Sequence, residues 1–336
     1  MRAYELREAI GVEGVVLNPD RPTPEAGQGE ILVRVRAASL NYRDLLIARG
    51  AYRSGAKPNT IPLSDGAGDV VAVGPGVTRF KVGDRVAGAF FPDWLGGEVS
   101  TEAVSRARGG SVDGMLAEHT VLHETAAIAI PAHMSFEEGA TLPCAGLTAW
   151  NAVVEIANIR AGETVLVLGT GGVSLFALQF AKLRGARAIL TSSSDDKLVM
   201  AKTLGADEVI NYRETFDWHK KVVELTGGRG VDLTVEVGGA GTLERSIRAT
   251  RLGGAIALIG VVAEPAQIDP RLVMSRGVRL QGVIVGSLEM FAAMNAALTE
   301  AELRPVIDRV FPFEEAREAY AHLQSARHFG KVVIAV

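Results

Sequence analysis

The fold is decided by one stretch, Thr164-Val165-Leu166-Val167-Leu168-Gly169-Thr170-Gly171-Gly172-Val173-Ser174. Its first five residues form a continuous apolar run, which predicts a parallel strand buried on both faces. Glycines follow this run directly, and the spacing of apolar residues over Val173–Leu183 predicts a helix. A glycine-rich turn between a strand and a helix can serve packing alone. It is also the arrangement that binds a dinucleotide, and we therefore expect cofactor binding here.

Each position of the glycine turn has a role in that interpretation. Gly169 allows the tight turn, and Gly171 lets the backbone approach a pyrophosphate. Thr170, Gly172 and Val173 complete the turn and open the helix, whose N-terminus offers N–H donors to an anion. Ser174 stands where a third glycine would normally serve packing of the helix on the strand.

Apolar strands recur on both sides of this stretch and alternate with helical segments. We expect strands over 188–190, 208–210, 231–237, 256–259 and 280–285, with helices over 173–183 and 197–204. Alternation of this kind predicts an α/β fold with a doubly wound parallel sheet. Residues 131–287 are therefore expected to form a Rossmann dinucleotide-binding domain.

The residues before this domain read differently, as short strands punctuated by glycine. Residues 31–37, 68–74 and 84–88 are such strands, and residues 100–114 read as a long surface loop. The chain ends in an apolar strand, Lys331–Val336, which needs a partner. The simplest arrangement is that this strand joins the sheet formed by the first part of the chain. A discontinuous domain of residues 1–130 and 288–336 is therefore expected, with a small β-barrel or sandwich as its core.

Composition limits the classes of function. The chain has 336 residues, which suggests about two domains, and a net charge of 35 − 39 = −4, which excludes a strongly basic nucleic-acid footprint. The single cysteine, Cys144, excludes an internal disulfide and a cysteine-rich structural zinc site. No apolar run reaches the ~18 residues of a membrane span, and the first residues lack a signal-peptide core. We expect a cytoplasmic protein with a small-molecule substrate and neither nucleic acid nor membrane as a partner.

The choice of cofactor is read about 20 residues after the glycine turn. NAD enzymes place an acid at the tip of that second strand, whereas this chain has Ser192 and Ser193, with Lys197 following. Serines and a lysine can donate to a 2′-phosphate, which favours NADPH. In the alternative interpretation Ser194 caps the next helix, with Asp195 and Asp196 in its first turn. The two interpretations are compatible.

Several motifs in order resemble the medium-chain dehydrogenase/reductase superfamily. They are the β-rich first part, Leu142–Trp150, the turn Gly169–Ser174 and Gly330-Lys331-Val332-Val333. Ser39-Leu40-Asn41-Tyr42-Arg43-Asp44 is similar to the zinc-free branch, that of the quinone oxidoreductases. The resemblance covers nearly the whole chain and implies a GroES-like β-barrel catalytic domain beside the Rossmann domain. It also implies a homodimer, which we expect to form through the edge strand 279–286.

In zinc-dependent members of that superfamily the catalytic metal is bound by Cys, His and Cys. The resemblance places these positions near Asn41, Ser64 and Cys144, of which only Cys144 has a ligand type. His119 and His123 are a rival metal pair, but four residues of strand span about 13 Å, too far for two ligands of one ion. No metal site is therefore predicted.

Without a Lewis acid, the substrate must already be electrophilic, as quinones and alkenes conjugated to a carbonyl are. The developing oxyanion needs hydrogen-bond donors, and a proton must follow. Asn41, Tyr42 and Tyr52 are the candidate catalytic donors. Gly50-Ala51-Tyr52 resembles the segment that carries the proton-donor tyrosine in enoyl-thioester reductases of the superfamily, although a tyrosine that merely packs a lid fits equally well. The competing functions are a zinc-free alcohol or aldehyde oxidoreductase and a non-enzymatic, crystallin-like NADPH-binding protein.

Further cofactor contacts are expected where strands end at the carboxyl edge of the sheet. These candidates are Gly238, Gly260, Val261 and Gly286, although glycines after strands also serve as plain turns. Thr148 and Lys331 match superfamily positions near the nicotinamide and at the terminal motif, which the resemblance alone implies.

Overall fold

The computed structural model describes residues 1–52, 56–260 and 267–336, and the chain divides into two compact units. Unit 1 comprises Met1–Leu147 and Gly286–Val336, and unit 2 comprises Thr148–Val285. By contacts between residues, the first boundary lies 17 residues later than the expected residue 130. The reason is local: the short helix α2 (Phe136–Gly139) packs on strands β3, β4 and β15 of unit 1.

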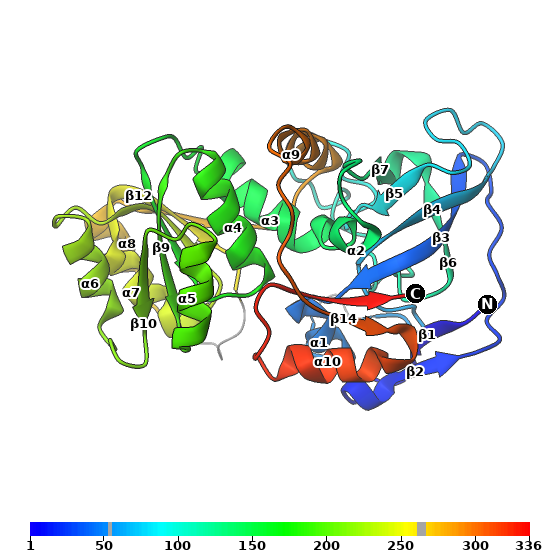
Figure 1. The fold of residues 1–336 in the computed structure, drawn as a ribbon, viewed down its shortest axis with the longest axis horizontal. Coiled ribbons are helices and arrows are strands. Elements are labelled where there is room, and N and C mark those ends of the chain that lie inside the picture. The colour runs from blue at the N-terminus through cyan, green and yellow to red at the C-terminus, as the bar shows by residue number, and fades with distance from the viewer. Residues whose placement is uncertain (53–55, 261–266) are drawn as a thin grey trace. The chain divides into compact units, whose positions relative to one another are not determined.

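Unit 2 is a parallel six-stranded sheet in the order β10-β9-β8-β11-β12-β13 (Figure 1). Its strands are β8 (Thr164–Leu168), β9 (Arg187–Ser192), β10 (Glu208–Asn211), β11 (Val231–Glu236), β12 (Thr250–Leu258) and β13 (Arg279–Gly282). Its helices are α4 (Gly172–Leu183), α5 (Asp195–Thr203), α6 (Trp218–Leu225), α7 (Ala240–Ala249) and α8 (Pro270–Arg276). The predicted α/β architecture is confirmed.

Burial explains why the apolar run at residues 164–168 formed the clearest strand in the sequence. Strand β8 lies between β9 and β11, helix α4 packs on it, and all five of its residues are buried. A strand covered on both faces must be apolar at every position rather than at alternate ones. At the sheet edge β13 ends at Gly282, three residues before the expected end, and all four of its residues are exposed.

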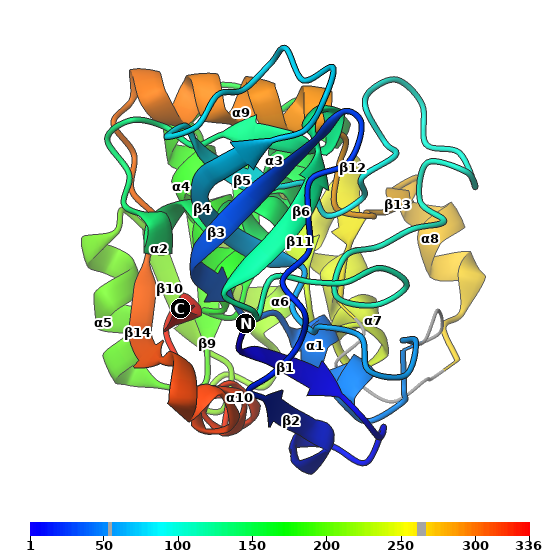
Figure 2. The same cartoon turned by 90° about the vertical axis from the view of Figure 1, so that its right-hand side faces the viewer.

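Unit 1 is built on a seven-stranded sheet in the order β14-β15-β3-β4-β5-β7, with β6 also paired to β3 (Figure 2). Its strands are β3 (Glu30–Ser39), β4 (Asp65–Val73), β5 (Arg85–Gly88), β6 (His119–His123), β7 (Ala127–Ala129), β14 (Ile307–Pro312) and β15 (Lys331–Ala335). A hairpin of β1 (Ala3–Leu6) and β2 (Val15–Asn18) stands beside this sheet as a separate one. The longer helices of unit 1 are α1 (Tyr42–Ala48), α9 (Leu288–Glu300) and α10 (Ala316–Gln324).

The terminal strand joins the first part of the chain, as predicted. β15 runs antiparallel to the second half of β3 and parallel to β14. The first half of β3 pairs instead with β6, so one long strand holds two partners along the same side. This pairing places Lys331, the first residue of β15, close to the end of β3 and the start of α1.

After α2 the chain forms a π-helical turn (Leu142–Gly146) that contains Pro143 and leads into α3 (Leu147–Trp150). One other region differs from the expectation. The loop over residues 100–114 has no helix or strand, but residues 107–110 are buried rather than exposed. Among the described residues, no helix is both long and apolar enough to cross a bilayer.

Candidate active site

A buried lysine organises the candidate catalytic residues of unit 1. Lys331 is 3% exposed, and its Nζ donates hydrogen bonds to the carbonyl of Leu40 and to Asn41 Oδ1, the latter at 2.7 Å. An ammonium can only donate, so this contact fixes which end of the Asn41 amide faces Lys331. The amide nitrogen, Nδ2, therefore lies on the side away from the ammonium, where it also helps to lower the pKa of Asp65. Lys331, expected as a cofactor contact, holds the candidate catalytic residue Asn41.

A buried carboxyl group lies near this lysine. Asp65 opens β4 and is fully buried, and it accepts hydrogen bonds from Ser64 Oγ at 2.6 Å and from the backbone N–H of Cys144 at 3.1 Å. Burial raises the pKa of Asp65, while Lys331, Ser64 and Asn41 act in the opposite direction. Burial likewise lowers the pKa of Lys331, with Asp65 opposing the change. Each group thus lessens the cost of burying the other.

Residues 41–44 carry buried polar atoms that lack hydrogen-bond partners among the described residues. They are Asn41 Nδ2, Arg43 Nε, Arg43 Nη2 and Asp44 Oδ1. Asp44 Oδ2 accepts from the backbone N–H of Asn41 at 2.7 Å and so caps the start of α1. Burial raises the pKa of Asp44 to about 6, with Arg43 opposing the rise. Unpaired buried groups are rare in native structures, and a cluster of them indicates a place where another molecule supplies the partners.

The two candidate tyrosines lie in different surroundings. Tyr42, at the start of α1, is exposed. Tyr52 lies over the buried Arg43, whose Cζ is 5.0 Å from the centroid of the Tyr52 ring and 4.6 Å from that of Phe90. Arg43 Nη1 donates to the carbonyl of Arg108 at 2.8 Å. The structure therefore brings Tyr52 to Arg43, two residues from Asn41, and keeps Tyr42 at the surface.

The glycine turn of unit 2 has the geometry that a phosphate cradle needs. Gly169 has φ +75°, a conformation that favours glycine, and no atom within 3.8 Å would meet a Cβ added there. Gly171 precedes α4, and Gly172 and Val173 form its first turn, where the N–H groups have no partner within the helix. Ser174 Oγ donates to the carbonyl of Leu168 at 2.7 Å, so the serine ties α4 to β8.

The tip of the second strand shows the predicted cap. Ser192 ends β9, and Ser194 caps α5, its Oγ accepting from the backbone N–H of Lys197. Asp195 accepts a hydrogen bond from Asn211 at 2.8 Å. The serine-capped helix is thus present. The structure does not test whether Ser193 and Lys197 also hold a 2′-phosphate.

The glycines expected at the strand ends have packing reasons of their own. A Cβ on Gly260 would lie 1.7 Å from the Val237 carbonyl oxygen, and one on Gly286 would lie 2.9 Å from Leu147. Gly286 belongs to unit 1, whereas Thr148 and Gly238 belong to unit 2. Val261 lies outside the described residues. These observations explain the glycines without deciding whether a cofactor contacts them.

Glu236 is a buried acid, not among the expected site residues, that orders one of the loops at the carboxyl edge of the sheet. It ends β11 fully buried and accepts from the N–H groups of Gly238 (2.7 Å) and Gly239 (3.0 Å) and from the hydroxyl of Thr242 (2.6 Å). The hydroxyl of Ser246 donates to its other oxygen. One carboxylate thus fixes the loop between β11 and α7. An acid at the end of a strand that is buried at every position was the available signal.

Comparison with known proteins agrees with this architecture. Residues 27–132 match the family model of the alcohol dehydrogenase GroES-like domain, and residues 172–300 match that of zinc-binding dehydrogenases. The chain is 43% identical over 316 residues to a zinc-type alcohol dehydrogenase-like protein of Schizosaccharomyces pombe, covering 92% of this chain and 91% of that protein. It is 30% identical to the quinone oxidoreductase of Lama guanicoe, covering 99% and 97%.

The chain belongs to the medium-chain dehydrogenase/reductase superfamily. It is therefore an oxidoreductase with quinone oxidoreductase and alcohol dehydrogenase relatives. Among solved superfamily structures, an NAD-dependent alcohol dehydrogenase is 38% identical with a TM-score of 0.91, covering 100% of both chains. A mycobacterial structure in complex with NADPH is 28% identical with a TM-score of 0.85, again covering both chains fully. The similar proteins thus include users of both cofactors.

The superfamily includes zinc-binding enzymes, so the atoms at the three metal positions decide whether this chain could bind zinc there. Asn41 Oδ1 accepts from the ammonium of Lys331, and Ser64 Oγ donates to Asp65. Burial, with Asp65, raises the pKa of the Cys144 thiol, whereas zinc binds the thiolate. A cation beside Asn41 and a protonated thiol do not fit a zinc site. Among residues 1–52, 56–260 and 267–336, no group of three or more His, Cys, Asp or Glu residues could hold a metal ion.

Proposed function

We propose that this protein is a zinc-independent, NADPH-dependent reductase of quinones or of alkenes conjugated to a carbonyl. The observation that carries the proposal is the cluster of unpaired buried donors at residues 41–43, with Asn41 oriented by Lys331. The donors suit an oxygen that becomes negative during the reaction, since preorganised hydrogen bonds stabilise such charge.

The proposal gives each of the candidate site residues a role. The N-terminus of α4 and Gly169–Val173 hold the pyrophosphate, with Ser192, Ser193 and Lys197 toward the 2′-phosphate. The bound nicotinamide would supply hydride to the electron-poor carbon. Asn41 Nδ2 donates to the substrate oxygen. Lys331 holds Asn41 Oδ1, which prevents the amide from rotating and turning Oδ1 toward the substrate. Tyr52 supplies the proton that completes reduction of an alkene.

Comparing enone and quinone substrates distinguishes the role of Tyr52 from that of Asn41. Tyr52→Phe should slow enone reduction by roughly 10²- to 10⁴-fold if Tyr52 is the general acid. The loss should be smaller for quinones, because their reduction forms a stable phenolate that needs no enzyme acid. NADPH affinity should survive in this variant. Tyr4→Phe is a matched control, since its hydroxyl bonds the carbonyl of Glu314 elsewhere in unit 1.

Other outcomes would favour the competing functions. If Tyr52→Phe leaves both reactions unchanged while Asn41→Ala abolishes both, the tyrosine only packs and water supplies the proton. Oxidation of alcohols without any alkene or quinone reduction would indicate the zinc-free alcohol oxidoreductase. Tight NADPH binding without turnover across the whole panel would indicate a non-enzymatic binding protein.

Cofactor preference has its own test in helix α5. A charge-assisted contact of Lys197 with the 2′-phosphate is worth about 1.5–3 kcal/mol, or roughly 10- to 150-fold in affinity. Lys197→Ala should therefore weaken NADPH binding by that factor and leave NADH nearly unchanged. Lys202→Ala, an exposed lysine of the same helix, is the control. Equal affinity of the parent protein for the two cofactors would overturn the NADPH assignment and point to Asp195 or Asp196 as the ribose ligand.

A further inference from the structure

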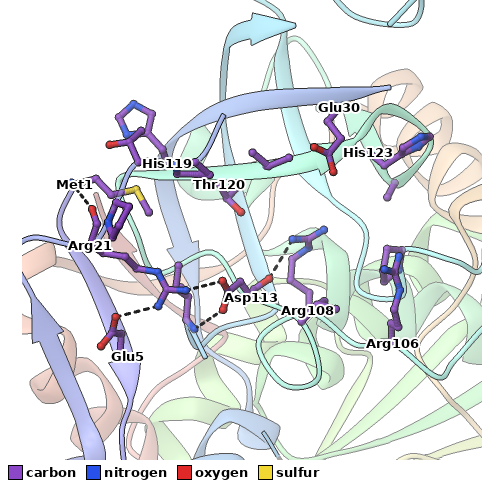
Figure 3. Close-up of a pocket in the computed structure, with 18 of the residues that line it drawn as sticks. Met1, Glu5, Arg21, Glu30, Arg106, Arg108, Asp113, His119, Thr120 and His123 are labelled. Atoms are coloured by element: carbon purple, nitrogen blue, oxygen red, sulfur yellow. Dashed lines mark hydrogen bonds and ion pairs between the residues drawn. The ribbon is translucent and has the colours of Figure 1, made fainter. Parts of the chain in front are cut away.

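Unit 1 contains a cavity of about 660 Å³ that the proposed reaction does not use (Figure 3). Its walls include the segment after β2, residues 106–113 of the loop over residues 100–114, and strand β6. None of Asn41, Tyr42, Tyr52 and Lys331 lines it. The volume lies within the roughly 300–1,000 Å³ that is usual for small-molecule sites.

Most charged groups in the cavity wall already have partners. Arg21 pairs with Glu5 at 3.0 Å and with Asp113 at 2.7 Å, as Figure 3 shows. Arg106 pairs with Asp93 at 2.7 Å. Glu30 accepts a hydrogen bond from the backbone N–H of Gly27 at 2.9 Å.

Arg108 is the exception. It is 5% exposed, and its hydrogen bonds go to backbone carbonyls: Nε to Ala89 at 3.5 Å and Nη1 to Asp113 at 3.2 Å. Among the described residues no carboxylate lies within 4.0 Å of its guanidinium, and no hydrogen bond engages Nη2. Burial lowers the pKa of Arg108 to about 10, so the group remains charged at neutral pH. Asp113 stabilises this buried charge only at a distance, because its carboxylate is paired with Arg21, and Arg106 opposes the charge. A buried charge without a direct ion pair is costly, and an anion in the cavity would lessen that cost.

The rest of the wall limits what that anion can be. Pro22, Pro24, Ile61, Val112 and Val121 give it an apolar surface. Burial lowers the pKa of His119, which keeps this wall residue neutral. The carboxylates of Glu30 and Asp113 also line the cavity and would repel a second negative charge. These features together suit one negative charge on an apolar body, and they oppose phosphates and dicarboxylates.

We propose that this cavity binds an organic monocarboxylate, with its carboxylate on Arg108 and its apolar body against the proline and aliphatic wall. The site would also bear on the catalytic segment, because the backbone carbonyl of Arg108 accepts the hydrogen bond from Arg43 Nη1. One residue therefore faces the cavity with its side chain and anchors Arg43 with its main chain.

The experiment uses 2-naphthoate as the probe and isothermal titration calorimetry on the full chain saturated with NADPH. We expect one 2-naphthoate per chain, and binding at least tenfold weaker for the neutral isostere 2-naphthamide. Arg108→Met, which keeps the apolar stem, should weaken 2-naphthoate binding at least tenfold. Arg106→Met should change it less than threefold, because Asp93 already neutralises Arg106.

Two results would overturn the proposal: no binding of 2-naphthoate at 10 mM to the NADPH-saturated chain, or equal affinity in the parent and Arg108→Met. If Arg108→Met does not fold, 2-naphthoate binding to Val121→Trp tests the proposal instead. This change fills the cavity from β6 without touching Arg108. Loss of 2-naphthoate binding in that variant supports the site, and unchanged binding contradicts it.

Discussion

At the scale of single residues, the decisive contacts join positions far apart in the chain. Lys331 and Asn41 are 290 residues apart, and their side chains are 2.7 Å apart. The sequence placed Asn41 and Tyr52 in the candidate site by resemblance and put Lys331 with the cofactor contacts. It gave no means of finding the Lys331–Asn41 contact, because that contact depends on how β15 pairs with β3. Asp65, a fully buried acid at the start of β4, was the overlooked signal.

Asp44 leads to a prediction about pH and stability. Its pKa is raised from 3.8 to about 6 in the folded protein, which corresponds to roughly 3 kcal/mol. Between these two values the folded state binds more protons than the unfolded state, so the free energy of unfolding should fall as pH rises from about 4 to 6. Asp44→Asn keeps an acceptor oxygen for Asn41 N–H and should remove this part of the pH dependence.

Urea unfolding of the parent and Asp44→Asn at several pH values between 4 and 7 measures the difference. The exposed Asp20→Asn is the control and should follow the parent. A parent protein whose stability, relative to Asp44→Asn, does not decline over this range would show that Asp44 is not buried as a raised-pKa acid.

At the scale of elements, local sequence was informative wherever burial imposed a pattern. β8 and α4 begin and end within one residue of expectation, because the run is apolar throughout and glycines mark its end. Strand ends at the edge of the sheet were less certain: β13 stops at Gly282 because pairing with β12 ends there. The loop over residues 100–114 read as surface because it is polar, but Arg108 folds inward over Gly88.

Two glycines at the carboxyl edge of the unit 2 sheet should respond differently to substitution. A Cβ at position 260 would overlap the backbone of Val237, so Gly260→Ala should cost about 3 kcal/mol or more. A Cβ at position 169 would meet no atom closer than 3.8 Å. Gly169→Ala should therefore lower the free energy of unfolding only through its positive φ, by about 1–2 kcal/mol. Thermal unfolding compares the two. A larger loss for Gly169→Ala would contradict the packing explanation of Gly260.

At the scale of the whole molecule, the exposed edge of unit 2 predicts self-association. β13 ends the sheet with its outer edge unpaired within the described residues, and Leu280 and Ile284 are 38% and 49% exposed nearby. An edge of this kind favours pairing with a second copy across a two-fold axis.

Light scattering should therefore give about twice the chain mass of 35.5 kDa. Leu280→Lys should shift the equilibrium toward the single chain, because a lysine on an edge strand opposes pairing. Val199→Lys, at an exposed position on α5, should leave the mass unchanged. A dilute parent protein at the mass of one chain would count against the dimer.

We propose that this superfamily member reduces activated alkenes or quinones without a metal, because Asn41, Ser64 and Cys144 stand at the zinc-ligand positions and do not fit a zinc site. The most direct measurement is NADPH consumption with an enone and with a quinone by protein dialysed against a chelator, with zinc counted on the same sample. We predict full turnover with far less than one zinc per chain, and its loss in Asn41→Ala. Turnover that disappears with a stoichiometric zinc and returns only when zinc is restored would contradict the account.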